Sequence, residues 1–429
     1  MTKNNDSERG DGMKYAIWVV RFWYAGWMIP AGLEHFIHIY PQPGADTTIP
    51  LQHEMLYALL DSHLFDVVKA VELITGISVL FGLFTPVILL ACMPVAFCVF
   101  WWDSPLARWN SSSVIAGARV LASNVLLSVA FIGCYKSMFT LRAKPRGFDA
   151  PSAVGAAGNP AMKHMVLAGR VIFGAWMLAN GANHFFFSLW PTPIGQGPLA
   201  IELMGAFVHT RLMDVAMLIE LITGALMLAG FIVPAALCVV MPISTCALYW
   251  SILDHQPLGL LLGLAAFALN GLLMLAYLEY YKGALSRAAL TLGETGRSGI
   301  WDSLFVNSKG RTSRGQFTAA LLPLAFVVWF YAHTGPNAYA PWNLLVLLFP
   351  AVVLHARRLH DLGQSGWLLL APALLTIAAM AIWARLLNLD AQLNFAVPLA
   401  AVVVFAGFAV WGCIANGQTE ANGFGPVAA

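Results

Sequence analysis

Two matching sets of polar residues within apolar segments carry the groups that could do chemistry. The first set consists of Arg21, His35, Asp66, Glu72 and Asn124. The second set follows 146 to 149 positions later and consists of Arg170, His184, Asp214, Glu220 and Asn270. A charged side chain near the centre of a bilayer costs roughly 2.5–3.5 kcal/mol on insertion scales. We therefore predict that the Arg and the Glu of each set form an ion pair.

Each set predicts a polar column through a helical bundle. His and Asp would lie near the outer end, Glu in the middle, Arg toward the inner end, and Asn would project from the fourth helix. Such a column is either a ligand or proton-linked site, or a set of ion pairs and hydrogen bonds that fixes helix packing. The first set is the more polar candidate, because Glu34 and Lys69 accompany it where the second has Asn183 and Met217.

The composition explains why these residues are unusual. Hydrophobic residues make up 59% of the 429 positions and charged residues only 10%, whereas a soluble domain is usually about 25% charged. The mean hydropathy is +0.73, so the chain is predicted to lie in a bilayer. The net charge of +2 and the absence of a basic, groove-like run argue against nucleic-acid binding. The six cysteines have no metal-ligand spacing, so we expect no metal site and buried, inert thiols.

The fold is predicted to be all-α, with about twelve transmembrane helices arranged as three four-helix bundles. A spanning helix needs about 20 apolar residues, and twelve such segments can be recognised. They are 15–39, 65–84, 86–102, 114–135, 164–189, 212–232, 234–251, 258–280, 317–333, 342–356, 367–385 and 394–414. Aromatic residues near segment ends are typical of a membrane-interface belt: Trp101, Trp102, Tyr249 and Trp250.

The first two bundles form an internal repeat. The run Glu72-Leu-Ile-Thr-Gly76 returns as Glu220-Leu-Ile-Thr-Gly224, and Pro86 and Pro94 return as Pro234 and Pro242. Each copy has four spans, so both enter the membrane from the same side. This parallel repeat predicts a pseudo-twofold pair of bundles with its axis along the membrane normal.

Polar, basic connections separate the bundles. The predicted divisions are a polar tail (1–13), a first bundle (14–142), a Pro/Gly linker (143–162), a second bundle (163–281), a linker (282–300) and a last domain (301–429). Lys and Arg concentrate in the tail and the linkers, and 41–63 contains neither. The positive-inside rule therefore predicts that both termini are cytoplasmic and that 41–63 is an outer loop.

Each of the first two bundles resembles the DoxX family of four-helix membrane proteins. The resemblance rests on the early Arg, the Gly-x-x-His end of the first helix, the helix-two Glu-Leu-Ile-Thr-Gly run and the Gly-Leu-Phe-Thr-Pro86 link. It covers 14–142 and 163–281. It implies a bacterial inner-membrane location and association with a redox system, with quinone as a possible cofactor and a redox protein as a possible partner.

The last third resembles domain of unknown function 805. The motifs are Gly310-Arg-Thr-Ser-Arg314-Gly-Gln-Phe317, Arg357-Arg-Leu-His-Asp361-Leu-Gly-Gln-Ser-Gly-Trp367 and Asn422-Gly-Phe-Gly-Pro426; the pair Gly315-Gln316 departs from the family pattern. A compact basic group could bind an anion or a lipid headgroup at the cytoplasmic face. Its members are Arg311, Arg314, Arg357, Arg358 and His360. The alternative is topological charge in a hairpin that Asp361 ties to an arginine and that Ser365 caps.

Three functions remain open from the sequence. The favoured one is an accessory, non-catalytic subunit of a redox system, with His35 and Glu72 in a quinone-facing pocket. The others are a small-molecule or proton-linked transporter and a lipid-binding scaffold that interacts with anionic phospholipid. No catalytic nucleophile, metal-binding set or nucleotide loop can be recognised.

Overall fold

The computed structural model describes residues 2–41, 44, 46–145, 160–292, 300–334, 338–387 and 389–428. Over these residues the chain is helical, and the one β contact is an isolated bridge between Asn422 and Gly425. Ten helices of the described chain are long and apolar enough to cross a membrane. The predicted all-α, polytopic membrane fold is confirmed.

Three groups of helices follow one another along the chain. The first contains α1 (Thr2–Ile37), α2 (Pro50–Asp61), α3 (Leu64–Phe81), α4 (Thr85–Trp101), η1 (Trp102–Leu106), α5 (Ser111–Ala130), α6 (Ile132–Tyr135) and η2 (Lys136–Phe139). The second contains α7 (Pro160–Ala182), η3 (Asn183–Phe187), α8 (Pro198–His209), α9 (Leu212–Ala229), α10 (Val233–Asp254), α11 (Pro257–Ala276) and η4 (Leu278–Tyr281). The third contains η5 (Asp302–Val306), α12 (Arg314–Thr334), α13 (Ala340–Asp361), η6 (Gly366–Leu369), α14 (Leu370–Trp383) and α15 (Ala391–Ile414). We call the first two groups repeat 1 and repeat 2.

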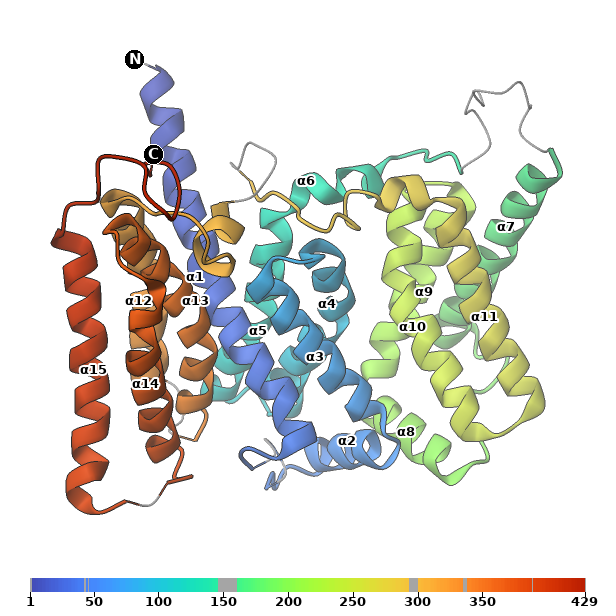
Figure 1. The fold of residues 1–429 in the computed structure, drawn as a ribbon. Coiled ribbons are helices and arrows are strands. Elements are labelled where there is room, and N and C mark those ends of the chain that lie inside the picture. Colours follow the sequence, from blue (N-terminus) through green and yellow to red (C-terminus); the bar gives the residue numbers. More distant parts are fainter. Residues whose placement is uncertain are drawn as a thin grey trace.

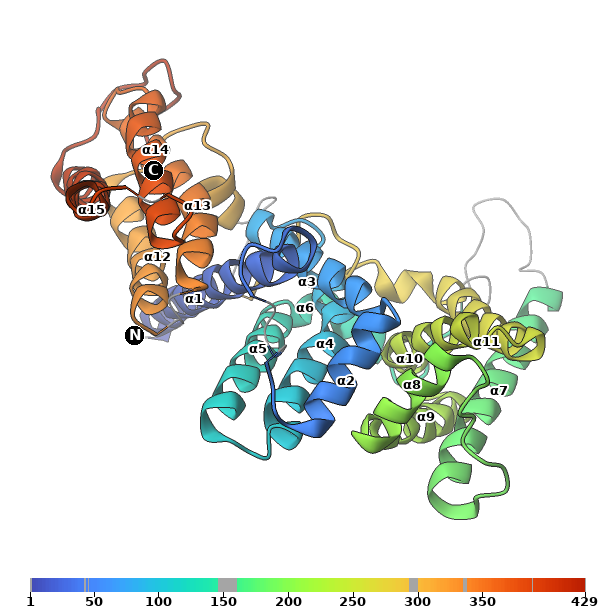
Figure 2. The same cartoon turned by 90° about the horizontal axis from the view of Figure 1, so that it is seen from below.

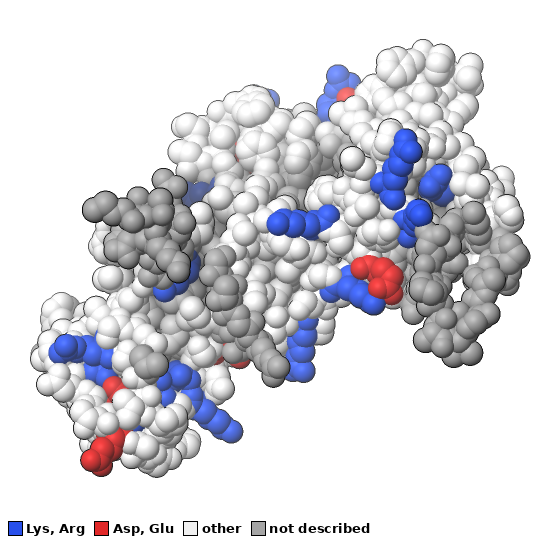
Figure 3. Space-filling view, turned by 90° about the horizontal axis from the view of Figure 1, so that it is seen from above, with Lys and Arg blue, Asp and Glu red and all other residues white. Residues whose placement is uncertain are grey.

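The three groups lie in a row, with repeat 1 in the middle (Figures 1 and 2). Both chain ends and the described residues next to each connection between groups lie on one face, which we call the termini face (Figure 1). Helices α2 and α8 lie on the other, which we call the α2–α8 face. Lys and Arg side chains are spread over the termini face, with few acidic ones among them (Figure 3).

Several predicted boundaries change. The tail predicted at 1–13 continues α1 as helix from Thr2, and 146–159 of the first linker and 293–299 of the second lie outside the described residues. The prediction of a loop over 41–63 was wrong for its second half, which forms α2, and repeat 2 has the equivalent α8. Both helices begin with a proline, at the position where a missing N–H costs least.

The two repeats exchange matching hydrogen bonds at the α2–α8 face. The Trp101 indole donates to the Thr210 carbonyl at 3.0 Å, and the equivalent Tyr249 hydroxyl donates to the Ser62 carbonyl at 2.5 Å. Beside them, α2 and α8 share a core. Its buried residues are Met55, Ala58, Leu64, Leu203 and Ala206. Trp101 and Tyr249 therefore join the repeats, a role that the interface-belt interpretation did not include.

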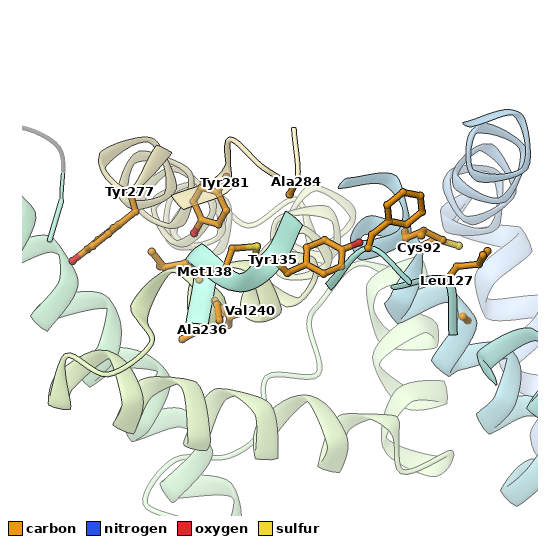
Figure 4. Packing of buried hydrophobic residues seen from close by; sticks show 14 of the residues in the cluster. Cys92, Leu127, Tyr135, Met138, Ala236, Val240, Tyr277, Tyr281 and Ala284 are labelled. Carbon is orange, nitrogen blue, oxygen red and sulfur yellow. The ribbon is translucent and has the colours of Figure 1, made fainter. Parts of the chain in front are cut away.

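The exchange is repeated at the termini face. The Phe84 N–H of repeat 1 donates to the Arg287 carbonyl at 2.9 Å, and the Ile232 N–H of repeat 2 donates to the Leu141 carbonyl at 3.0 Å. Met138, from the end of repeat 1, lies among the buried residues of α10 (Figure 4). Contacts that run equally in both directions are the signature of a twofold, self-complementary interface.

Helix α1 belongs to two cores. Phe22 packs against Trp301 and Phe305 with ring centroids 4.7 and 4.9 Å apart, and the Tyr331 hydroxyl of α12 donates to the Trp23 carbonyl. The third group is thus fastened to the side of repeat 1 that faces away from repeat 2 (Figure 2).

Candidate functional site

The two repeated arginines lie at helix C-termini. Arg21 donates to the Val79 carbonyl at 2.9 Å and stacks over the Trp301 ring at 4.0 Å. The Arg170 guanidinium lies 3.5 Å from the point where a Cβ on Gly230 would lie, next to the αL residue that ends α9. Cations at a helix C-terminus are stabilised by its free carbonyls and by the helix dipole. This placement supports a structural role for both arginines.

The predicted Arg–Glu pairs are replaced by other contacts. Glu72 forms an ion pair with Lys69 at 2.9 Å, one turn away on α3. Arg21 contacts Val79 instead, seven residues or about 10 Å along the helix from Glu72. The prediction assumed that the long Arg21 side chain would reach Glu72, and it gave Lys69 no part in the pairing.

A close crossing of α1 and α3 positions the Lys69–Glu72 pair. A Cβ on Gly32 would lie 2.7 Å from the Lys69 carbonyl, and one on Gly76 would lie 2.8 Å from the Ile29 nitrogen. Small residues let membrane helices approach until their backbones touch. Residues on the facing sides of α1 and α3 are consequently shielded, and Lys69 and Glu72 are both buried.

Glu34 adds a second buried carboxylate to this crossing. Its side chain is 1% exposed, and within the described part of the chain its Oε2 has no hydrogen-bond partner. Glu34 follows Gly32, which packs on the Lys69 backbone, by two residues, and the charges of Lys69 and Glu72 act on it although the described ion pairs join only those two residues. Repeat 1 therefore holds two carboxylates and one ammonium in a buried group, which we call the Glu34–Lys69–Glu72 cluster.

Two tyrosines border the cluster toward the α2–α8 face. Tyr40 follows α1 and Tyr339 precedes α13, with ring centroids 4.6 Å apart. Burial raises the pKa of both phenols; the charge of Glu34 raises that of Tyr40 further, and the charges of Asp46 and then Glu34 raise that of Tyr339. A residue that leads into the third helical group thus packs on Tyr40, which follows the α1 end of the cluster.

Repeat 2 has a reduced version of this site. Glu220 is buried and its Oε2 has no described hydrogen-bond partner. Asn183, at the Glu34 position, instead binds the backbone N–H groups of Leu189 and Trp190. Arg170 borders a separate pocket of about 240 Å³ at the end of the bundle. The predicted Arg170–Glu220 ion pair is not among the ion pairs of the described residues.

The predicted His and Asp residues meet in both repeats. His35 Nε2 lies 2.7 Å from Asp66 Oδ1, and His184 Nε2 lies 2.9 Å from Asp214 Oδ1. All four are only partly buried. These pairs join the first long helix of each repeat to the N-terminal turn of α3 or α9, close to the α2–α8 face.

The two asparagines fasten proline-interrupted helices. Asn124 donates to the Tyr24 hydroxyl at 3.0 Å and to the Leu89 carbonyl at 3.3 Å, five residues before Pro94. In the amide orientation that satisfies its neighbours, Asn270 donates to the Leu237 carbonyl at 3.3 Å, five residues before Pro242. Because a helical proline removes a donor and opens the helix next to it, these amides compensate polar groups at the break.

Replacing Asn124 with leucine should lower the free energy of unfolding by about 1–2 kcal/mol, since a buried hydroxyl and a carbonyl lose their partner. Thermal unfolding in detergent measures the loss. The exposed Gln392→Leu on α15 is the control and should leave the midpoint nearly unchanged. An unchanged midpoint for Asn124→Leu would refute the structural role of this amide.

At the termini face, one carboxylate joins two arginines of the third group. Arg311 Nη2 lies 2.9 Å from Asp361 Oδ1, and Arg358 forms an ion pair with Asp361 Oδ2. Arg311 also donates to the Gln418 and Glu420 carbonyls, and Arg358 donates to the carbonyl that follows α15 at Ala415. All three charged residues are buried. We call this arrangement the Asp361 knot.

The remaining basic residues surround the knot. Arg357 binds three backbone carbonyls between Asn307 and Arg311, and His360 stacks on Phe424 with centroids 4.1 Å apart. Arg314 is exposed and contacts the Asn416 side chain at 3.2 Å. These contacts support the alternative in which Asp361 ties the hairpin, and Ser365 caps the next helix with a bond to the Trp367 N–H.

This is the segment that a known family describes. Residues 305–426 match the family model described as Protein of unknown function (DUF805). The resemblance of the last third is confirmed, and 1–304 lie outside the match. No curated protein and no solved structure matches the chain. We refer to 305–426 as the DUF805 segment.

The described residues contain no group of three or more His, Cys, Asp and Glu that could hold a metal ion. All six cysteines are free thiols; Cys92 is buried within the protein, and Cys98 and Cys246 lie at its surface on the apolar helices α4 and α10. The predicted site residues did not include Glu34 and Lys69, although their absence from repeat 2 already marked repeat 1 as the more polar.

Proposed function

We propose that this chain is an accessory, non-catalytic membrane subunit of a redox system and that repeat 1 carries its quinone-facing site. The proposal includes a bacterial inner-membrane location, with the termini face in the cytoplasm. The basic side chains of the termini face support that orientation. The DoxX resemblance of 14–142 and 163–281 supports the redox association.

The observation that carries the proposal is the Glu34–Lys69–Glu72 cluster. The fold does not require the Lys69–Glu72 ion pair or the buried Glu34 carboxylate on the facing helix, since Met217 and Asn183 replace Lys69 and Glu34 in repeat 2. Intramembrane ionisable residues mark ligand or proton sites by default. Repeat 2 would then serve as the structural partner of repeat 1.

The donor chemistry of the cluster fits a quinone headgroup. Quinone carbonyls accept hydrogen bonds, and a lysine ammonium has three donors, of which one is directed to Glu72. Glu34 Oε2 has no described hydrogen-bond partner and would accept from the hydroxyl of a reduced quinone. His35 and Asp66 form a partly buried pair toward the same face.

The double variant Glu34→Asn/Lys69→Met tests the proposal, because it gives repeat 1 the residues that repeat 2 already contains. We expect wild-type protein, gently extracted from its own membrane, to retain a quinone detectable by native mass spectrometry and lipid extraction. The double variant should lose it. The control Glu220→Gln, in repeat 2, should retain it.

Equal quinone content in wild type and double variant, or none in either, would contradict the proposal. Proton uptake by wild-type proteoliposomes without quinone, abolished by the double variant, would favour the transporter. Enrichment of anionic phospholipid alone, reduced by Arg314→Gln, would favour the lipid-binding scaffold.

A further inference from the structure

A groove separates repeat 1 from the DUF805 segment on the membrane-facing side. It lies between α1, α5 and α12 and has a volume of about 310 Å³. Its apolar walls include Val19, Trp23, Ala122, Phe326 and Phe330. At the groove, the side chains of repeat 1 and of the DUF805 segment do not fill the space between the two helical groups.

One charged residue, Arg119, faces this groove. It lies in the apolar helix α5, and its side chain is exposed. The described ion pairs give it no carboxylate partner, and its one aromatic contact places it over the Phe330 ring at 5.4 Å from the centroid. Repeat 2 has Ala265 at the equivalent position, so the repeat fold does not require this arginine.

Arg119 is placed so that its side chain extends toward the α2–α8 face. Its Cα lies eight residues, or about 12 Å, from the start of α5. Side chains on a helix lean toward its N-terminus, which for α5 is the α2–α8 face, so the long side chain carries its guanidinium toward that surface. The position of Phe330 also places the guanidinium toward this face, since Phe330 lies four residues, or about 6 Å, from the end of α12.

We propose that this groove, which we call the Arg119 groove, binds a phospholipid from the leaflet on the α2–α8 face. Its phosphate lies on the Arg119 guanidinium, and one acyl chain lies between α1 and α12. Arginine pairs with phosphate through parallel N–H donors. The phosphate gives Arg119 a negatively charged partner, which the described part of the protein does not. The acyl chain of the lipid fills an apolar space that is open to the membrane.

Binding of dioleoyl phosphatidylglycerol to delipidated protein in detergent, counted by native mass spectrometry, tests the proposal. Arg119→Met keeps an unbranched side chain and removes the charge. It should bind the lipid roughly tenfold more weakly, the effect of losing one charge-assisted hydrogen bond. The control Arg108→Met removes another exposed arginine near this face and should bind as wild type does.

A second variant keeps Arg119 and blocks the groove. Ala122→Phe places a ring where the acyl chain would lie and should also weaken binding. Dioleoylglycerol and inorganic phosphate, which each carry half of the ligand, should not distinguish Arg119→Met from wild type.

Wild-type affinity for phosphatidylglycerol in both Arg119→Met and Ala122→Phe would overturn the proposal. So would an equal loss in Arg108→Met, which would indicate general surface charge. Loss of quinone in the repeat 1 double variant concerns a different site, so the two proposals can fail separately.

Discussion

Replacing Asp361 with asparagine should destabilise the DUF805 segment by about 3–5 kcal/mol, the usual cost of removing one partner from a buried ion pair. Asparagine keeps the shape of the side chain. It leaves the buried guanidinium groups of Arg311 and Arg358 without their shared countercharge. The backbone carbonyls that also bind these arginines carry only partial charge and do not replace it.

The loss should appear as a lower unfolding midpoint in detergent and as faster proteolysis of the tail after Ile414, which both arginines hold. Asp390→Asn is the matched control. Asp390 caps α15 from an exposed position, and asparagine caps about as well. If Asp361→Asn and Asp390→Asn unfold together with the wild type, the knot does not stabilise this segment.

The second large effect is expected at the crossing of α7 and α9. A Cβ on Gly224 would lie 2.7 Å from the Gly174 carbonyl and would also meet the Leu178 nitrogen. Backbone atoms cannot rotate away, so Gly224→Ala forces the helices apart. Overpacking costs about 1–3 kcal/mol, more than the gain in helix propensity of about 1 kcal/mol.

Gly271→Ala is the control for this prediction, because the position lies within a helix and a Cβ there meets nothing within 4 Å. It should leave stability unchanged or raise it slightly. Thermal unfolding of the two variants in the same detergent makes the comparison. A Gly224→Ala protein as stable as Gly271→Ala would show that the crossing tolerates separation.

The sequence predicted the helices well because long apolar runs and repeated motifs are local signals. It missed α2 and α8, which at 12 residues each are too short to span a membrane and whose apolar sides meet in a shared core. Trp101 shows the same limit. Tryptophan is typical of a membrane interface, but the Trp101 indole donates its hydrogen bond to the other repeat.

Pairing of charged residues was the least predictable part of the site. Arg21 and Glu72 looked like partners because both are costly to bury, yet a helix end satisfies one and Lys69 the other. Depth estimated from residue counting does not resolve which of several polar groups a long side chain reaches. The His35–Asp66 pair was predictable because both residues lie at adjoining helix ends.

The reciprocal contacts between the repeats affect how the sequences of the two halves can evolve. Two identical subunits must accept every mutation twice, at both related positions. A fused pair keeps the stabilising exchange between Trp101, Thr210, Tyr249 and Ser62 while each half mutates independently. One half can therefore retain costly buried charges, and the other can discard them and specialise in supporting it.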